Sequence, residues 1–452
     1  MRFFRKRQTL DQLPAIALQA DSVKVLLDAA AFRAELLQRI AQAKNRIYLC
    51  SLYLQNDEAG QQIMAALHAA KAARPELDVA VLVDWHRAQR GLIGEARIPG
   101  KVAGNAAWYQ QLNTGHDTQV PVYGIPVQTR ELFGVLHLKG FIVDDTVIYS
   151  GASINNVYLQ YADKYRHDRY LLIDNATLAN SMIDFIRQHL LSAAAVHRLD
   201  VHDIPPTRQI RGEIRAFRAR LKKAYYRFNA SEMHAEHTLS VTPLAGVGKN
   251  NPLNKIICQT LSGAREQITI CTPYFNFPLA VKREINKALR RGVRVDIIIG
   301  DKIANDFYIP PEQQFKAIGA LPYLYEMNLR RFAKSHQREI NAEQLHLHLW
   351  RDRDNTYHLK GIWVDRHIAL VTGNNLNPRA FRLDLENALL IHDPHQELSA
   401  MWQRELDSIY THTREVAHYR QLEHVRDYPL PVRQLLTRLS AVRLDRLAYK
   451  VL

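Results

Sequence analysis

The stretch that decides the fold occurs twice in this chain. The sequence reads HLKGFIVD at residues 137–144 and HLKGIWVD at residues 358–365. Both copies have the spacing HxKxxxxD, with Leu after His, Gly after Lys and Val before Asp. One copy alone is typical of an ordinary strand with a solvated polar residue. Two copies with matching intervening residues indicate a duplicated functional site.

The flanks of both copies are apolar, which favours buried strands. Side chains two residues apart on a strand project from the same face, so His137 is expected to point with Lys139, and His358 with Lys360. A fixed ammonium can hold the non-bridging oxygens of a phosphate while an imidazole attacks phosphorus or transfers a proton. The two copies would supply one imidazole for each side of the phosphorus.

The duplication extends beyond the motif. An apolar run at 46–54, a helical pattern and a second apolar run at 79–83 are repeated as 267–275, a helical pattern and 293–299. This order of strand, helix and strand indicates βαβ units, in which helices cover a sheet. The predicted fold class is therefore α/β, with two homologous halves, each a mostly parallel or mixed sheet covered by helices.

The predicted domain organisation follows from this repeat. Pro205, Pro206 and a charged helical stretch at 211–227 separate the two halves. The predicted segments are a basic N-terminal segment with the cluster Arg2–Arg7 (1–35), the first half (36–235), the second half (236–405) and a helical basic tail (406–452). Residues 431–452 predict an amphipathic helix, which either lies on an anionic membrane or docks on its own domain.

Small polar residues follow each motif, at 150–155 and at 372–377. Beyond each of these turns an acidic residue, Asp168 or Glu386, stands at the start of an apolar run. A carboxylate bonded to one nitrogen of an imidazole would fix its tautomer and leave the other nitrogen free to react. An N-cap or surface position is the alternative for each carboxylate.

Charge and composition restrict the partners. The chain has 452 residues and a formal net charge of +15, which favours a polyanionic partner such as nucleic acid or an anionic membrane leaflet. Cys50, Cys258 and Cys271 lie far apart in apolar runs, which is typical of reduced core cysteines in a cytosolic protein. We expect neither a signal peptide nor a transmembrane span, because no apolar run approaches about 20 residues.

Two HxKxxxxD copies with trailing Gly/Asn turns resemble the phospholipase D superfamily. Within it, the chain is similar over nearly its whole length to the Gram-negative bacterial CDP-diacylglycerol–serine O-phosphatidyltransferase family. The stretches that carry this narrower resemblance are VLVDWHRAQRG at 81–91, GVLHLKG at 134–140, CTPYFN at 271–276, ANDFYIP at 304–310 and DNTYHLKG at 354–361.

The resemblance implies a phosphatidyl transfer in two displacements at one site shared by the two halves. His137 would attack the β-phosphorus of CDP-diacylglycerol, and His358 would protonate the departing CMP. His358 would then take the proton of the L-serine hydroxyl as serine attacks the phosphatidyl-histidine. Lys139 and Lys360 would hold the phosphoryl oxygens, so the reaction needs no metal and no cofactor. Two equivalent imidazoles could exchange these roles.

The resemblance also assigns the remaining motif positions. Asp144 and Asp365 belong to the motif and are expected to brace loops rather than to touch substrate. The family's turn usually has Ser after Gly, but this chain has Ala at that place in its first turn. Asn155 and Asn375 are therefore the first candidates for contacting the phosphate, and Ser153 and Asn377 are the alternates.

A further group of polar residues follows predicted strand ends, where α/β sheets carry their ligand-binding loops. They would bind the cytidine diphosphate or serine, although a salt bridge or turn is the alternative for each. These candidates are Arg87, Arg90, Tyr274, Lys302, Asn305 and Asp306.

Other functions of the same superfamily stay open at this point. A phospholipase D or a cardiolipin synthase would use both motifs with water or a lipid alcohol as acceptor, and a nuclease would suit the positive charge. A catalytically dead lipid- or RNA-binding scaffold would show a decayed motif, whereas both copies here keep His, Lys and Asp. The expected setting is the cytoplasm, with peripheral attachment to the inner membrane and a possible association with RNA or ribosomes.

Overall fold

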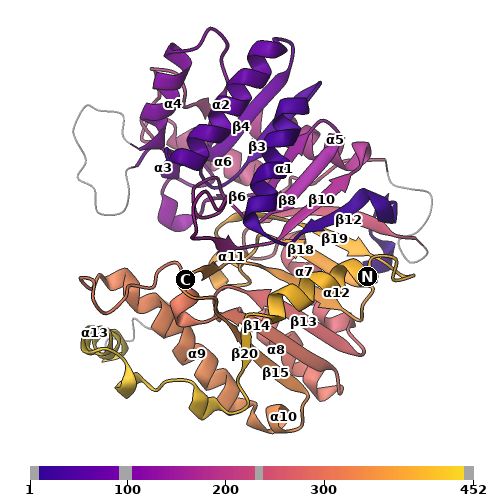
Figure 1. Cartoon of the computed structure of the whole chain (residues 1–452), viewed down its shortest axis with the longest axis vertical. Coiled ribbons are helices and arrows are strands. Elements are labelled where there is room, and N and C mark those ends of the chain that lie inside the picture. Colours follow the sequence, from indigo (N-terminus) through magenta and orange to yellow (C-terminus); the bar gives the residue numbers. More distant parts are fainter. Residues whose placement is uncertain (1–9, 91–103, 230–237, 442–452) are drawn as a thin grey trace, which may run out of the picture.

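The computed structural model describes residues 10–90, 104–229 and 238–441. The chain forms two α/β halves that lie one above the other in Figure 1, and each half is built on its own large sheet. The predicted fold class is confirmed, since both sheets are mixed and both are covered by helices. The predicted cluster Arg2–Arg7 and residues 442–452 lie outside the described residues.

The first half contains an eight-stranded sheet. Its parallel strands come from the expected order of strand, helix and strand. Its antiparallel strands include the one formed by residues 140–143 of the first motif copy. In spatial order its strands are β11 (His197–Arg198), β5 (Val122–Ile125), β4 (Asp78–Asp84), β3 (Arg46–Cys50), β7 (Gly140–Val143), β8 (Thr146–Ser150), β10 (Tyr170–Asp174) and β2 (Val23–Leu26).

The second half contains a ten-stranded sheet with the same central arrangement. Parallel β13 (Gln267–Thr272) and β14 (Arg294–Gly300) correspond to β3 and β4, and antiparallel β17 (Gly361–Val364) corresponds to β7. Its path runs through β1 (Ile16–Ala17), β12 (Ser240–Val247), β19 (Leu385–His392), β18 (Ile368–Thr372), β17 (Gly361–Val364), β13 (Gln267–Thr272), β14 (Arg294–Gly300), β15 (Leu345–Trp350) and β20 (Thr413–Glu415), with β6 (Leu136–His137) paired to β19.

Helices begin where the sequence supplies N-caps and bury their apolar faces on the sheets. Asp28 caps the helix 29–42, and Asp57 caps the helix 58–73, each by accepting a backbone N–H of the first turn. The α-helices are α1 (Ala29–Gln42), α2 (Glu58–Ala73), α3 (Trp85–Ala88), α4 (Asn105–Thr114), α5 (Ala176–Phe185), α6 (Arg211–Leu221), α7 (Pro252–Gly263), α8 (Leu279–Arg290), α9 (Leu321–Ser335), α10 (Gln337–Asn341), α11 (Pro378–Arg382), α12 (Ser399–Tyr410) and α13 (Leu430–Ala441).

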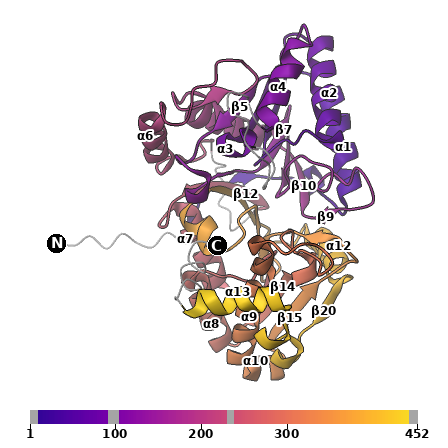
Figure 2. The same ribbon diagram turned by 90° about the vertical axis from the view of Figure 1, so that its left-hand side faces the viewer.

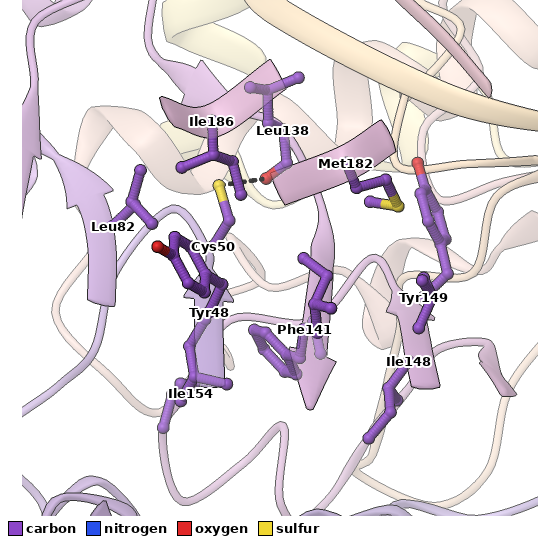
Figure 3. Packing of buried hydrophobic residues seen from close by; sticks show 14 of the residues in the cluster. Tyr48, Cys50, Leu82, Leu138, Phe141, Ile148, Tyr149, Ile154, Met182 and Ile186 are labelled. Carbon is purple, nitrogen blue, oxygen red and sulfur yellow. Dashed lines mark hydrogen bonds between the residues drawn. The ribbon is translucent and has the colours of Figure 1, made fainter. Parts of the chain in front are cut away.

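The core of the first half lies against the central strands and reaches the first motif copy. Figure 3 shows Tyr48 and Cys50 of β3 among the apolar side chains around Leu138. The Sγ atom of Cys50 lies 3.7 Å from the carbonyl oxygen of Leu138, the residue between the motif His and Lys. The three cysteines are free, as predicted, and Cys50 and Cys271 are buried. This packing fixes the backbone between His137 and Lys139.

The halves exchange short strands at their boundary. From the first half, β6 pairs in parallel with β19 of the second sheet. The two-residue strands β9 (Arg166–His167) and β16 (Thr356–Tyr357), one from each half, also pair in parallel. Both exchanges involve chain next to a motif copy, so they bring the two copies together.

The local geometry of the motif differs from the prediction of one continuous strand. His137 ends β6, and the chain then enters β7 at Gly140, in the other sheet, so Lys139 lies between two strands. His358 and Lys360 likewise lie between β16 and β17. The chain passes from one pairing partner to another at each copy because β6 and β16 pair with the opposite half.

The tail helix is docked on the protein. Val432 and Leu436 of α13 are buried against Tyr323 and Leu324 of α9, where α13 crosses the second half in Figure 2. Val432 and Leu436 are therefore used inside the molecule, in line with the docked alternative for this part of the tail. Within the described part of the chain, no helix is both long and apolar enough to span a bilayer.

The predicted limits at residues 35, 235 and 405 stay predictions. The second sheet includes β1 near the N-terminus and β20 beyond residue 405, and the first sheet includes β2. Each half thus draws strands from segments on both sides of these limits.

Candidate active site

Side chains from both halves line one cavity of about 870 Å³. His137 and His358 both face it, together with Lys139. The remaining lining residues are Leu52, Tyr53, Arg87, Arg90, Glu131, Leu132, Val135, Ser153, Tyr158, Arg166, Tyr274, Asp306, Phe307, Ile318, Leu321, Tyr325, Asn375, Asn377, Arg379 and Asp384. The two motif copies thus meet at a single site between the halves.

Each histidine is paired with the acidic residue of the opposite half. The Nδ1 atom of His137 lies 2.9 Å from Oε2 of Glu386, and the register of β6 and β19 places these two residues side by side. The Nδ1 atom of His358 lies 2.9 Å from Oδ2 of Asp168. With Nδ1 bonded to the carboxyl group, Nε2 is the nitrogen of each ring that can carry out chemistry, and in His358 it lies beside the amino group of Lys360.

The two lysines are buried beside the histidines. Lys139 is 2 % exposed and Lys360 is 1 % exposed. The Nζ atom of Lys360 lies 2.9 Å from Nε2 of His358 and 3.7 Å from Oδ2 of Asp168. The Nζ atom of Lys139 donates to the carbonyl oxygen of Ala152, at 3.3 Å. Two amino groups are therefore held inside the protein at the place where a phosphate would enter.

Glycine follows each lysine because a side chain would not fit there. Gly140 has φ +129°, and a Cβ atom on it would lie 2.6 Å from Cε of Met182. A Cβ atom on Gly361 would lie 2.6 Å from Nη1 of Arg169. The shared Gly of the motif thus lets the chain pass closely under neighbouring elements.

Burial is the main cause of the lowered pKa values of the two histidines and the two lysines. It lowers the pKa of His358 to about 3, with Lys360 adding to the effect, and it holds the pKa of His137 well below its usual value. Burial also lowers the pKa of Lys139 to about 8 and that of Lys360 to about 7. Both imidazoles are therefore neutral at pH 7 in the unliganded site, which is the state a nucleophile needs.

The two carboxyl groups differ. Burial raises the pKa of Glu386 to about 8, and its Oε1 atom has no hydrogen-bond partner among the described residues. Burial would also raise the pKa of Asp168, but Lys360 and the bond to His358 outweigh it and hold this pKa well below its usual value. Asp168 is thus a carboxylate at neutral pH, whereas Glu386 is largely protonated.

The motif aspartates brace loops, in line with the expectation for them. The carboxylate of Asp144 accepts the backbone N–H groups of Lys44, Asn45 and Arg46 at 2.7 to 3.1 Å. Asp365 accepts three N–H groups in the same way just before β13, from residues 265–267. Neither aspartate is among the described residues that line the cavity.

The turns after the motifs contribute one of the two first candidates, Asn375, and both alternates, Ser153 and Asn377. Ser153 and Asn375 line the cavity, and Oδ1 of Asn375 is buried without a partner among the described residues. Asn377 also lines it, although its Oδ1 accepts a backbone N–H at the start of α11. Asn155 is not among the lining residues, because its Oδ1 accepts the N–H of Tyr158. Ser153 and Asn375 are therefore the better candidates for phosphate contact.

Four of the six weaker candidates line the cavity. Arg87 and Arg90 both pair with Glu131, at 3.3 and 2.7 Å. The hydroxyl of Tyr274 donates to Oδ1 of Asp306 at 2.6 Å. The cavity therefore has two polar groupings, one with the arginine pair and one with Asp306.

Local contacts hold Lys302 and Asn305, the other two weaker candidates. The Nζ atom of Lys302 lies 3.0 Å from Glu326 and 2.8 Å from Glu423, so two ion pairs hold it. Asn305 caps a turn by accepting the N–H of Phe307. Neither is among the described residues that line the cavity, because local capping and ion pairing satisfy both side chains.

Several site residues were missed by sequence reasoning. Arg166 and Tyr158 line the cavity next to His358. Asn387 exchanges two hydrogen bonds of 2.8 Å with the backbone of Lys139, across the boundary of the halves. Arg169 pairs with Glu405 at 2.7 Å. Arg169 and Asn387 could have been found from the sequence by their positions, because Arg169 directly follows Asp168 and Asn387 directly follows Glu386.

One cluster outside this cavity has the ligand types of a metal site. Asp296, His346 and His348 offer atoms that lie within 4.8 Å of one another on β14 and β15. Asp296 already pairs with Arg294, and His346 with Glu415. None of the three lines the cavity of the motif histidines, so the cluster is separate from the site described here.

Comparisons with known proteins agree with this architecture. The family model described as cardiolipin synthase, PLD-like domain, matches residues 36–190 and 257–410. CDP-diacylglycerol–serine O-phosphatidyltransferase PssA of Escherichia coli is 52 % identical over 451 residues, covering 99 % of this chain and 98 % of that protein. The CDP-diacylglycerol–serine O-phosphatidyltransferase of Haemophilus influenzae is 50 % identical over 452 residues, with the same coverage.

A solved structure gives the same result for the fold. The crystal structure of phosphatidylserine synthase from Haemophilus influenzae matches with a TM-score of 0.94 and 48 % identity, covering 98 % of each chain. Both motif copies, the shared cavity and this full-length similarity lead to one assignment. The chain belongs to the phospholipase-D-like family of CDP-diacylglycerol–serine O-phosphatidyltransferases.

Proposed function

We propose that this chain transfers the phosphatidyl group from CDP-diacylglycerol to L-serine and releases CMP, as a step of phospholipid biosynthesis. The observation that carries the proposal is the meeting of two histidine–carboxylate pairs in one cavity, each assembled from both halves. The full-length relatives named for this reaction support the choice of donor and acceptor.

In the first displacement, Nε2 of His137 attacks the β-phosphorus, and the bond from phosphorus to the CMP oxygen breaks. His358 gives its Nε2 proton to the leaving CMP. The free site keeps His358 neutral, but a bound diphosphate is a nearby anion and raises the pKa of the imidazole. Substrate binding itself would therefore load the proton that the leaving group needs.

In the second displacement, neutral His358 takes the proton of the serine hydroxyl, and the serine oxygen attacks the phosphatidyl-histidine. The bond from phosphorus to Nε2 of His137 breaks, and the overall products are phosphatidylserine and CMP. His358 is assigned to this side because Arg166, Asp306 and Tyr158 surround it with groups suited to a polar acceptor. His137 is then the nucleophile on the opposite side.

The cations and turn side chains stabilise the transferring phosphoryl group. Lys139 and Lys360 are positioned before substrate arrives, so they need not reorganise as charge develops on the oxygens. Ser153 and Asn375 add hydrogen-bond donors from the two turns. Asp168 and Glu386 hold the histidine rings in the orientation that both displacements use.

The experiment that tests the reaction measures CMP release from CDP-diacylglycerol in mixed micelles, with and without L-serine. Release that rises steeply with serine and yields phosphatidylserine is expected for the wild type, and it should vanish in His137→Ala and His358→Ala. The exposed His202→Ala is the control for loss of an unrelated imidazole. Wild-type enzyme incubated with CDP-diacylglycerol without serine should carry the phosphatidyl group on His137 rather than on His358, and mapping the modified histidine after proteolysis would assign the nucleophile.

Other outcomes of this assay point to the other functions of the superfamily. Rapid CMP release that does not depend on serine indicates a hydrolase or transfer to another alcohol, as in a phospholipase D or a cardiolipin synthase. No release at all would contradict a CDP-diacylglycerol donor and favour the phosphodiesterase, nuclease or scaffold alternatives.

We also propose that the chain works as a peripheral protein on an anionic membrane, at the cytoplasmic face of the inner membrane. Leu132 lines the cavity and is 59 % exposed, and the adjacent Phe133 is 45 % exposed. These two residues, the rim pair, lie next to Arg87 and Arg90, so apolar and basic groups meet at the cavity edge. A lipid substrate could pass from a bilayer to the site along this edge.

Sedimentation with vesicles of phosphatidylglycerol and phosphatidylcholine tests the rim pair. Leu132→Glu together with Phe133→Glu is expected to weaken binding by at least about tenfold, because two large apolar side chains no longer enter the lipid. Leu279→Glu is the control, since Leu279 is 72 % exposed but does not line the cavity. Equal binding of the double variant and the control would contradict the proposal.

The basic end of the tail is a separate part of this proposal. Residues 442–452 contain Arg443, Arg446 and Lys450, and deleting them is expected to weaken binding to anionic vesicles in a salt-dependent way. Non-specific association with RNA or ribosomes rests on the net charge of +15 alone. Filter binding of RNA across a salt series tests it, and an affinity that does not change with salt would contradict it.

A further inference from the structure

Arg166 and Asp306 form an ion pair inside the cavity, although they come from different halves. Their Nη1 and Oδ2 atoms lie 3.6 Å apart, and their side chains are only 15 % and 18 % exposed. Both line the cavity together with His358. The pair thus lies beside the histidine that faces the acceptor.

The surroundings hold both charges in fixed orientations. The guanidinium of Arg166 lies 4.7 Å from the ring centroid of Tyr158, and its Nε donates to Thr356 at 3.0 Å. Asp306 accepts the hydroxyl of Tyr274 at 2.6 Å. Pairing of β9 with β16 brings Arg166 of the first half to the His358 side of the cavity. Neither side chain has the freedom of a surface residue.

The charges of L-serine, the proposed acceptor, match those of Arg166 and Asp306. L-serine carries a carboxylate, an ammonium and a hydroxyl on one short skeleton, and it is neutral overall. A largely buried Arg–Asp pair is also neutral overall, so a zwitterion can enter it without leaving an unbalanced charge in the protein. The guanidinium fork suits a carboxylate, and a carboxylate accepts from an ammonium.

We propose that Arg166 and Asp306 are the recognition site for the amino acid acceptor, with the serine carboxylate on Arg166, its ammonium on Asp306 and its hydroxyl directed at Nε2 of His358. Tyr158 supports this placement because its hydroxyl lies 3.0 Å from Nδ1 of His358 while its ring lies under Arg166. The proposal rests on the proposed role of His358 as the base for the acceptor. According to this proposal, an acceptor must carry both a carboxylate for Arg166 and an ammonium for Asp306.

The wild-type protein provides the first test. Ethanolamine is serine without the carboxylate, and 3-hydroxypropionate is serine without the ammonium. Each would leave one buried charge of the pair without its partner, so kcat/KM for each is expected to be at least about 100-fold below that for L-serine. If either analogue were used as well as serine, the proposal would be overturned.

Two substitutions test the residues themselves. Asp306→Asn and Arg166→Gln are each expected to raise the KM for L-serine by roughly 10- to 100-fold, while the KM for CDP-diacylglycerol stays within about twofold. Each substitution should also reduce the preference for L-serine over a different analogue. Asp306→Asn should narrow the gap between serine and 3-hydroxypropionate, and Arg166→Gln should narrow the gap between serine and ethanolamine. If the two residues had a merely structural role, each substitution would change the preference for serine over both analogues alike.

The chain offers a matched control pair. Arg187 and Asp78 also form an Arg–Asp ion pair, but they are 50 % and 44 % exposed on the first half and do not line the cavity. Arg187→Gln and Asp78→Asn make the same chemical changes there and should leave both KM values unchanged. Arg166→Lys, which keeps the charge but not the fork, should restore part of the serine affinity and guards against misfolding of Arg166→Gln.

An exchange assay separates this proposal from the catalytic one. Incorporation of labelled CMP into CDP-diacylglycerol without serine reports the first displacement alone. Exchange that persists in Asp306→Asn while the KM for serine rises supports the acceptor site. Persisting exchange with an unchanged KM for serine overturns it, and so does a rise in the KM for CDP-diacylglycerol alone, which would make the pair a nucleotide contact. No exchange in the wild type would count against the covalent route, and the KM for serine would still decide the acceptor site.

Discussion

The Nδ1 atom of His137 lies 2.9 Å from Oε2 of Glu386, although 249 positions of sequence separate the two residues. The equivalent contact of His358 also crosses between the halves, to Asp168. Neither half can therefore orient its own histidine. If the two halves separated, each histidine would lose the acidic side chain that orients it. Catalysis therefore depends on the packing of the halves.

The difference between the two carboxyl groups predicts unequal effects of amide substitution. Asp168→Asn removes a carboxylate that holds the tautomer of His358, and kcat is expected to fall roughly 10³-fold. Glu386 is largely protonated at pH 7, so the amide of Glu386→Gln resembles the native group and kcat should fall only about tenfold. Steady-state rates at saturating serine measure both. Equal losses in the two variants would show that Glu386 acts as a carboxylate.

The lowered lysine pKa values predict a loss of substrate capture at alkaline pH. A base whose folded pKa is lowered gives up its proton earlier as pH rises, here through about 7 for Lys360 and about 8 for Lys139. The cations that hold the phosphate are thus lost over this range. We expect kcat/KM for CDP-diacylglycerol to fall between pH 7 and pH 9, whereas kcat should fall less, because bound phosphate raises both pKa values. A kcat/KM that is flat to pH 9 would contradict the lowered values.

The bracing role of the motif aspartates predicts a stability effect. Asp144→Ala leaves three backbone N–H groups without their acceptor, so the free energy of unfolding should fall by about 1.5–3 kcal/mol. Denaturant unfolding followed by circular dichroism measures it, and kcat of the folded variant should stay close to that of the wild type. Asp145→Ala is the control, because Asp145 is 66 % exposed and pairs with Arg46 at the surface. A variant as stable as the wild type but inactive would instead make Asp144 part of the chemistry.

The bonds between Asn387 and Lys139 predict a coupling of stability and activity. Asn387→Leu removes the donor and the acceptor that satisfy the buried backbone of Lys139, which should destabilise the chain by about 1–3 kcal/mol and displace the lysine. We expect both the melting temperature and kcat to fall. Asn341→Leu, at an exposed helix end, serves as the control. Loss of stability without loss of kcat would mean that Lys139 is positioned by other contacts.

Local patterns in the sequence were sufficient for the halves and their motifs. The repeated HxKxxxxD, the order of strands and helices and the burial of Cys50 and Cys271 appear in the structure where they were expected, whereas Cys258 is only partly buried. Such features depend on neighbours within one strand or helix, whose side-chain period is fixed by backbone geometry. The strand prediction failed at Lys139, His358 and Lys360, where the chain passes between pairing partners.

The sequence by itself thus determined a duplicated α/β chain with two His–Lys motifs and two nearby acidic residues. Only the tertiary structure decided that each acid serves the histidine of the opposite half, that Ser153 rather than Asn155 lines the cavity, and that Arg166 meets Asp306. These contacts depend on two short pairings, β6 with β19 and β9 with β16. Strands of two residues carry no periodicity, so their partners are fixed by how the large sheets pack rather than by any local pattern.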